Sequence, residues 1–192
     1  MTNQTTNKLN LNFGIILGGI FSFFTAYSYA IDNSLYSSYW AFGGLLILPL
    51  IFGVIAILSA KKKSGGFITL KDGMKNFTAT ITLGLFISTM TGILVFNVVD
   101  TDFHKVVQQI QVDGLEKQKD RTLQGMYNRN TPESSIKNAE KGFDEAIEKI
   151  QTTNSFSIQN QLLVFIKSVG IYLIFGLILA MILKKQDPQS IQ

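Results

Sequence analysis

Four long apolar runs divide this chain of 192 residues, and they constrain its fold more than any other feature. They cover residues 13–30, 39–60, 77–99 and 162–183. A helix of roughly 20 residues crosses the hydrocarbon core of a bilayer. Asp, Glu, Lys and Arg are absent from the first three runs, and the fourth contains only Lys167. The pattern therefore predicts four transmembrane helices.

The composition agrees with a membrane environment. Only 16% of the residues are charged, against about 25% in ordinary soluble domains, and Asp32 is the single charge between residues 9 and 59. The net charge of +4 comes mainly from lysines that flank the apolar runs, where membrane insertion and anionic lipids explain them. We therefore expect a lipid bilayer around the chain and no nucleic-acid partner.

The first run has two interpretations. As a cleaved signal peptide, it would use Lys8 as its basic region and Ser28-Tyr29-Ala30 as its cleavage site. As a retained helix, it would use Gly14 and Gly18 as a close-packing face. We favour retention because a single lysine makes a weak basic region.

The lysines predict the orientation of the chain. In a four-span arrangement, eight of them fall on one side: Lys8, Lys61, Lys62, Lys63, Lys71, Lys75, Lys184 and Lys185. Positive charge in short loops marks the cytoplasmic side. The sequence thus predicts a multi-pass protein of the cell membrane with both termini in the cytoplasm, Gly65 inside, and Ser34 and Gln124 outside.

The outer insert, residues 100–161, has a helical pattern. Phe103, Val106 and Ile110 continue the apolar spacing of the third run, so the third helix is expected to extend past the membrane toward Leu115. A second, amphipathic helix follows, whose apolar stripe consists of Ile136, Ala139, Phe143, Ala146, Ile147 and Ile150. The simplest assembly is an antiparallel hairpin standing on the third and fourth spans. The expected interface residues are Phe103, Val106, Ile110, Ile136, Phe143, Ile147 and Ile150.

Small residues recur every four positions along the third run. Thr80, Gly84, Ser88 and Gly92 would let a neighbouring helix approach closely, as Gly14 and Gly18 would in the first run. A polar permeation path could use the same residues. Helix packing explains them better, because no carboxylate accompanies them inside the bilayer.

Residues that carry chemistry are scarce. His104 is the only histidine and Cys is absent, so histidine clusters, thiol chemistry and disulfides are excluded. Asp100 and His104 could form a weak cation site, but a solvated helix end explains them better. Every Asp and Glu lies outside the four runs, which disfavours ion-coupled transport. We predict no catalytic, cofactor-binding or metal-binding residues.

The stretch Gly66-Phe67-Ile68-Thr69-Leu70-Lys71-Asp72-Gly73 leads into the third run. Together with four spans and a long insert between the third and fourth, it resembles the bacterial membrane family known as domain of unknown function 4199. That resemblance covers nearly the whole chain. It implies the fold and the location but brings no activity and no functional residues.

These observations predict an all-α polytopic membrane protein with four transmembrane helices and a helical-hairpin extracytoplasmic insert. The expected function is a non-catalytic scaffold or interaction subunit, with a protein partner or a second copy bound through the outer hairpin. The alternative is an oligomeric pathway for a small solute or ion. An intramembrane enzyme is disfavoured because the spans contain no acid and no histidine.

Overall fold

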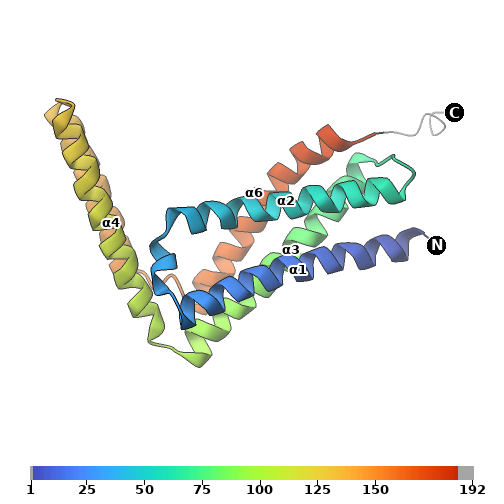
Figure 1. Cartoon of the computed structure of the whole chain (residues 1–192), viewed down its shortest axis with the longest axis horizontal. Helices are drawn as coiled ribbons and strands as arrows, with labels where there is room; N and C mark the ends of the chain where they lie inside the picture. Colours follow the sequence, from blue (N-terminus) through green and yellow to red (C-terminus); the bar gives the residue numbers. More distant parts are fainter. Residues whose placement is uncertain (1, 186–192) are drawn as a thin grey trace.

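The computed structural model describes residues 2–185, with side chains from Leu11 onward except those of Tyr39 and Phe42. The described chain is all-helical, which confirms the predicted fold class. Four helices are long and apolar enough to cross a membrane, over Leu11–Ala30, Gly43–Lys63, Leu70–Val99 and Ile158–Leu183. They run alternately up and down as a bundle (Figure 1).

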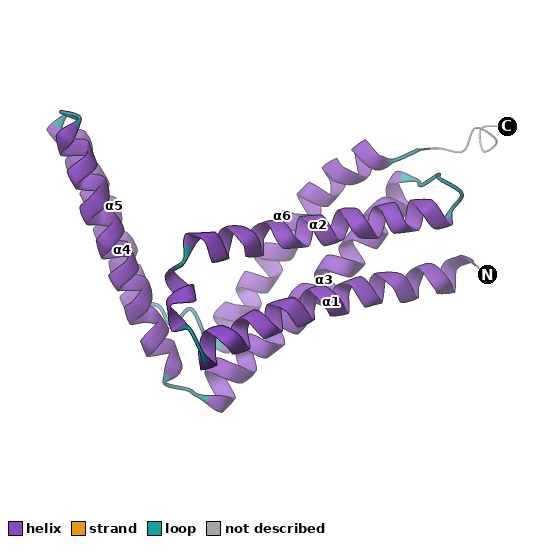
Figure 2. Cartoon of the chain, viewed as in Figure 1, coloured by secondary structure: helices purple, strands orange, loops and turns teal. Residues whose placement is uncertain are grey.

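Eight helical segments follow one another along the described chain (Figure 2). The bundle helices are α1 (Thr2–Ala30), α2 (Tyr39–Lys63), α3 (Leu70–Leu94) and α6 (Ile158–Leu183), and the insert contains α4 (Phe103–Asn128) and α5 (Glu133–Thr152). The short 3-10 segment η1 (Asn33–Ser37) connects α1 to α2, and the π-helical segment η2 (Val95–Val99) continues α3.

The α2–α3 connection is fixed by its backbone. Gly65 and Gly66 adopt positive φ angles of 69° and 90°, which glycine reaches without the steric cost of a Cβ. Thr69 then caps α3: its hydroxyl accepts the Asp72 N–H at 3.1 Å and donates to the Asp72 carboxylate at 2.7 Å. The chain therefore reverses sharply into the third span.

Helix α3 is the centre of the bundle and packs against α1, α2 and α6. Its Phe77 side chain is fully buried between two glycines. The ring meets Gly53 of α2 on one side, and on the other a Cβ at Gly176 of α6 would stand 2.5 Å from Phe77 Cδ1. Missing side chains on α2 and α6 thus create the space that Phe77 fills.

The end of α6 is held against the α2–α3 connection. Ile68 and Lys185 exchange backbone hydrogen bonds of 2.9 and 3.0 Å, and the Lys61 ammonium donates to the Leu183 carbonyl at 2.8 Å. The Lys185 ammonium also lies 5.4 Å from the centre of the Phe67 ring. Lys61 and Lys185, which are among the eight lysines that predict the orientation of the chain, therefore also make contacts within the fold.

The expected straight extension of α3 toward Leu115 is wrong. The chain turns at residues 100–102, where Asp100 has an extended backbone with φ −142° and ψ 92°. Its carboxylate accepts the N–H groups of Asp102 at 3.2 Å and Phe103 at 3.0 Å. A side chain that satisfies these free N–H groups starts a new helix, α4, in a new direction.

Candidate functional site

The small residues of the first and third spans meet at the α1–α3 contact. A Cβ at Gly14 would stand 2.9 Å from Leu83 Cβ, and one at Gly18 would stand 2.6 Å from Ile87 Cβ. From the other helix, a Cβ at Gly84 would stand 2.6 Å from Leu17 Cδ2. Real Cβ contacts are never this short, so this seam depends on glycine. Thr80 is fully buried in the same helix.

Ser88 and Gly92 lie elsewhere on α3. Ser88 lines a cavity, described below, and Gly92 faces α6, where a Cβ would stand 2.5 Å from Gln161 Oε1. The small residues spaced four apart on α3 therefore face three different surroundings: Gly84 faces α1, Ser88 faces the cavity and Gly92 faces α6. Their spacing in the sequence predicts close packing but does not indicate which surroundings each residue has.

Helices α4 and α5 pack side by side (Figure 2) and antiparallel. Near their base, Gln108 Nε2 donates to the carbonyls of Ile150 and Thr153, at 3.0 Å each. Midway, the Lys119 ammonium lies 2.6 Å from the Asp144 carboxylate and 3.7 Å from that of Glu140. The hydrogen bond to Asp144 is the main reason why the pKa of Lys119 is raised.

The seven residues expected at the hairpin interface differ in burial: two are buried, one is exposed and four are half-buried. Phe103 is buried at the base of α4, in edge contact with Tyr29, rather than on the hairpin seam. Ile136 is buried, whereas Val106 is 46% exposed. The remaining four are half-buried: Ile110, Phe143, Ile147 and Ile150.

The hairpin does not stand upright on the spans. It runs steeply across the end of the bundle, and its tip projects beyond the helices (Figure 1). Helix α4 crosses η1, where a Cβ at Gly114 would stand 3.0 Å from Ser37 Cβ. The turn at Asp100 redirects α4, so the base of the hairpin covers the α1–α2 connection.

An aromatic cluster joins the hairpin base to the bundle. Phe96 of η2 stacks on Phe156 at 4.2 Å between ring centres and on Phe103 at 5.5 Å. The Phe156 carbonyl also accepts the side-chain amides of Asn97 at 2.9 Å and Gln161 at 2.7 Å. These contacts fix the start of α6 against the end of α3.

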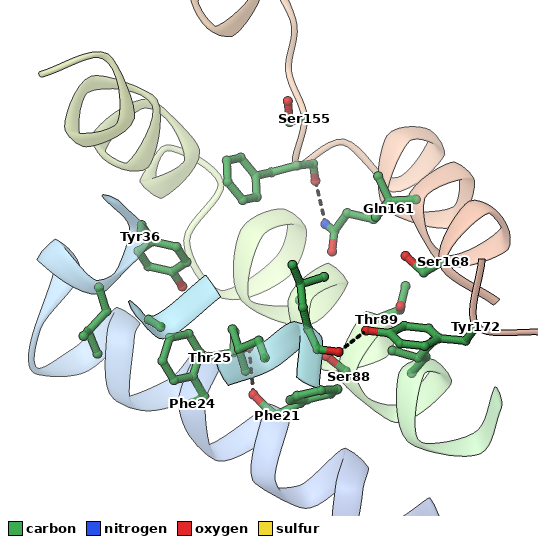
Figure 3. A pocket seen from close by; sticks show the side chains of 18 of the residues that line it. Phe21, Phe24, Thr25, Tyr36, Ser88, Thr89, Ser155, Gln161, Ser168 and Tyr172 are labelled. Atoms are coloured by element: carbon green, nitrogen blue, oxygen red, sulfur yellow. Dashed lines mark hydrogen bonds between the residues drawn. The ribbon is translucent and has the colours of Figure 1, made fainter. Parts of the chain in front are cut away.

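A cavity of about 740 Å³ lies beneath this cluster, between the four bundle helices (Figure 3). Most of its wall is apolar, with Phe21 and Phe24 from α1, Leu45 from α2, and Ile171 and Phe175 from α6. On the hairpin side it is bounded by η1, Phe96, Gln111 and Phe156. Away from the hairpin, the bundle is filled by buried side chains, among them Leu17, Ile57, Phe77 and Ile81.

Several uncharged polar groups also line the cavity. Ser88 and Thr89 come from α3, and Ser168 and Gln161 come from α6 (Figure 3). Tyr172 spans the gap from α6 to α2, because its hydroxyl donates to the Leu46 carbonyl at 2.9 Å.

Tyr36 and Trp40 lie only four residues apart but in different environments. Trp40 is 93% exposed. The Tyr36 hydroxyl, by contrast, is buried at the cavity wall and has no hydrogen-bond partner among the described residues. Burial raises the pKa of Tyr36 to about 12.

The remaining sequence candidates are surface groups. Lys62 and Lys63 are exposed at the end of α2, and Lys184 and Lys185 are exposed after α6. Asp100 acts as a helix cap, and His104 Nδ1 lies 2.6 Å from the Thr101 carbonyl. Among the described residues, no three His, Cys, Asp or Glu side chains gather as metal ligands would.

Comparison with curated proteins and with solved structures finds no match. A family model does match, over residues 12–185, which include most of α1, all of α2, α3 and α6, and the insert. Its description is "Protein of unknown function (DUF4199)". The match covers well over half of the chain, and the chain therefore belongs to the DUF4199 family.

Proposed function

We propose that this chain is a non-catalytic interaction protein of the membrane, and that its α4–α5 hairpin binds a helix of a partner protein or of a second copy. One observation carries the proposal: α5 is supported mainly by α4, and much of its apolar stripe is only half-buried. A third helix is the natural cover for such a stripe, as in a helical bundle.

The energetics of a two-helix unit support this function. Two helices bury a single seam, and isolated helices of this length are marginal in water. Ile136 is buried near the tip, but Phe143, Ile147 and Ile150 each keep part of their surface exposed. A partner helix along these three residues would remove apolar surface from water, which favours association.

The charges of the hairpin allow such a partner to approach. Residues 103–152 contain eight Lys and Arg and eight Asp and Glu, so their net charge is 8 − 8 = 0. A surface of mixed sign with zero net charge neither attracts nor repels a partner strongly over long range. The apolar stripe would then supply the affinity.

The orientation proposed for the membrane follows from the lysines. The start of α1, the α2–α3 connection and the end of α6 lie at one end of the bundle, and the hairpin lies at the other (Figure 1). The lysine-rich end would be cytoplasmic by the positive-inside rule. The hairpin would then meet its partner outside the cytoplasm.

A permeation pathway remains the alternative function. The cavity is polar enough on the α3 side to hold a solute, but Leu17, Ile57 and Phe77 fill the other half of the bundle. A pathway would therefore have to run between copies of the chain rather than through one copy. The hairpin interface would still be needed to assemble them.

The test compares two substitutions on α5 that add the same charge. Phe143→Asp places a carboxylate in the apolar stripe, whereas Asn138→Asp places it on the exposed face. The mass of the complex is measured by light scattering in mild detergent, and membrane insertion is checked for both variants. We expect Phe143→Asp to dissociate the complex and Asn138→Asp to leave it intact. If both variants keep the wild-type mass, the hairpin is a self-contained stalk and the proposal fails.

A further inference from the structure

We propose that the cavity between α1, α2, α3 and α6 binds one molecule of an uncharged amphiphile from the surrounding bilayer, with a long hydrocarbon chain and a carbonyl-containing head. This site is separate from the hairpin surface and does not depend on a protein partner. Four features of the cavity support it: its size, its lack of charge, an unsatisfied hydroxyl and its exposed edges.

The size and the lining of the cavity fit a hydrocarbon chain. A volume of about 740 Å³ falls inside the range of about 300–1,000 Å³ that small-molecule sites occupy. Five phenylalanines line it, Phe21, Phe24, Phe96, Phe156 and Phe175, together with several Leu and Ile side chains. Such walls offer dispersion contacts to a flexible chain and no partner to a solvated ion.

The cavity lining selects against a charged head. No Asp, Glu, Lys, Arg or His is among the described residues that line it. A charged group moved into such a site would lose its hydration without gaining a counter-charge. The polar side chains that line it carry only hydroxyl or amide groups: Thr25, Tyr36, Ser88, Thr89, Gln111, Ser155, Gln161, Ser168 and Tyr172. These groups bind uncharged oxygen atoms.

Tyr36 specifies the kind of polar group that the ligand carries. Its hydroxyl oxygen is buried at the cavity wall without a hydrogen-bond partner among the described residues. A buried donor without a partner is costly, so a turn of the Tyr36 side chain that brings its hydroxyl to a ligand acceptor in the cavity would be stabilising. Because the pKa of Tyr36 is raised by burial, the hydroxyl stays protonated and acts as a donor at neutral pH. A carbonyl oxygen is the matching acceptor.

The edges of the cavity indicate where the ligand enters. Leu46 and Ile47 of α2 and Val164 and Ile171 of α6 line the cavity, yet each is more than half exposed. These residues belong to two spanning helices, so their exposed surfaces face lipid when the chain is in a membrane. A lipid-like molecule could therefore pass between α2 and α6 without crossing water.

The experiment uses the full chain in lipid vesicles that contain a trace of a monoacylglycerol with a diazirine in its acyl chain. After illumination, the labelled residues are mapped by mass spectrometry. Ser168→Phe fills the cavity from α6, and Ser88→Phe fills it from α3, so one variant remains informative if the other fails to fold. The matched control is Gly170→Phe, on the same helix, where an added Cβ meets nothing within 4 Å.

We expect labelling of cavity residues on α2 and α6 in the wild type and in Gly170→Phe, and its loss in both cavity-filling variants. A lysophosphatidylcholine with the same labelled chain should label these residues far less, because its zwitterionic head carries a phosphate and an ammonium charge that the cavity cannot solvate. Tyr36→Phe should reduce monoacylglycerol labelling about two- to tenfold, the effect of one hydrogen bond, while labelling by a diazirine-bearing alkane stays unchanged. Undiminished labelling in folded Ser168→Phe or Ser88→Phe would overturn the site. Equal labelling by the charged lipid, or an equal loss of alkane labelling in Tyr36→Phe, would overturn the ligand class.

Discussion

Leu17 of α1 occupies the space left by the missing side chain of Gly84 on α3. A Cβ at Gly84 would stand 2.6 Å from Leu17 Cδ2 and 2.8 Å from its Cγ, and Leu17 itself is fully buried. Lipid surrounds the helices, so close packing rather than the hydrophobic effect holds them together. The α1–α3 seam is accordingly where the bundle tolerates added volume least.

Gly84→Leu should therefore destabilise the bundle, whereas Ser88→Leu should not. Overpacking of a close contact costs about 1–3 kcal/mol, but a leucine at position 88 would extend into the cavity. Thermal unfolding in detergent would measure both. Equal losses of stability in the two variants would contradict the assignment of Gly84 to a packed seam and Ser88 to a cavity wall.

The overall architecture could be predicted because the positions of the charged residues determine which segments can lie in a membrane. Runs without Asp, Glu, Lys or Arg must avoid water, and their lengths match a bilayer, so four spanning helices follow from the sequence. The cap at Thr69 is also local, since it needs only Asp72 three residues later. Features that depend on neighbours in sequence are the ones that sequence patterns predict.

The turn at Asp100 was missed because two signals compete there. Phe103, Val106 and Ile110 continue the helical period, but the Asp100 carboxylate accepts two backbone N–H groups and starts a new helix in another direction. Likewise, the partners of Gly14 and Gly84 and the position of the Tyr36 hydroxyl depend on how α1, α3 and η1 meet. Such tertiary relationships produce no periodic pattern in the sequence. The cavity depends on the same relationships, so the sequence does not predict it either.

The hydrogen bond from Tyr172 to the Leu46 carbonyl should stabilise the bundle modestly. Tyr172→Phe removes the donor of a 2.9 Å bond between α6 and α2 and little else. Hydrogen bonds between transmembrane helices contribute about 0.6 kcal/mol on average, so we expect a small loss of thermal stability with unchanged membrane insertion. A loss of several kcal/mol would show that Tyr172 does more than join these two helices.

Lys167 should tolerate replacement by leucine. Its side chain is exposed on α6, about five residues after the apolar run begins at Leu162, and its stem can run along the helix toward the headgroups. Lys167→Leu should insert, fold and assemble like the wild type in a blue-native gel. If Lys167→Leu inserts normally but no longer supports the function of the wild-type chain in cells, the permeation pathway would be favoured over the interaction protein.

Tyr36 should make the stability depend on pH at the alkaline end. Its pKa is about 12 in the folded chain and about 10 in an unfolded one. The unfolded chain therefore ionises first, so the free energy of unfolding is unaffected by this group below pH 10 and falls as the pH rises from 10 toward 12. Chemical unfolding at a series of pH values would show a smaller decline for Tyr36→Phe. An identical decline in both proteins would exclude Tyr36 as its source.

Labelling of single cysteines with a membrane-impermeant maleimide in intact cells tests the central claim most directly, namely that the hairpin and the termini lie on opposite sides of the membrane. The chain has no cysteine of its own, and Ser34, Ser64 and Gln124 are all exposed. Ser64 is a better inner position than Gly65, whose φ of 69° would strain a cysteine. We predict that Ser34→Cys and Gln124→Cys are labelled in intact cells and that Ser64→Cys is labelled only after the cells are permeabilised. Labelling of Ser64→Cys in intact cells, or protection of Gln124→Cys, would contradict the account.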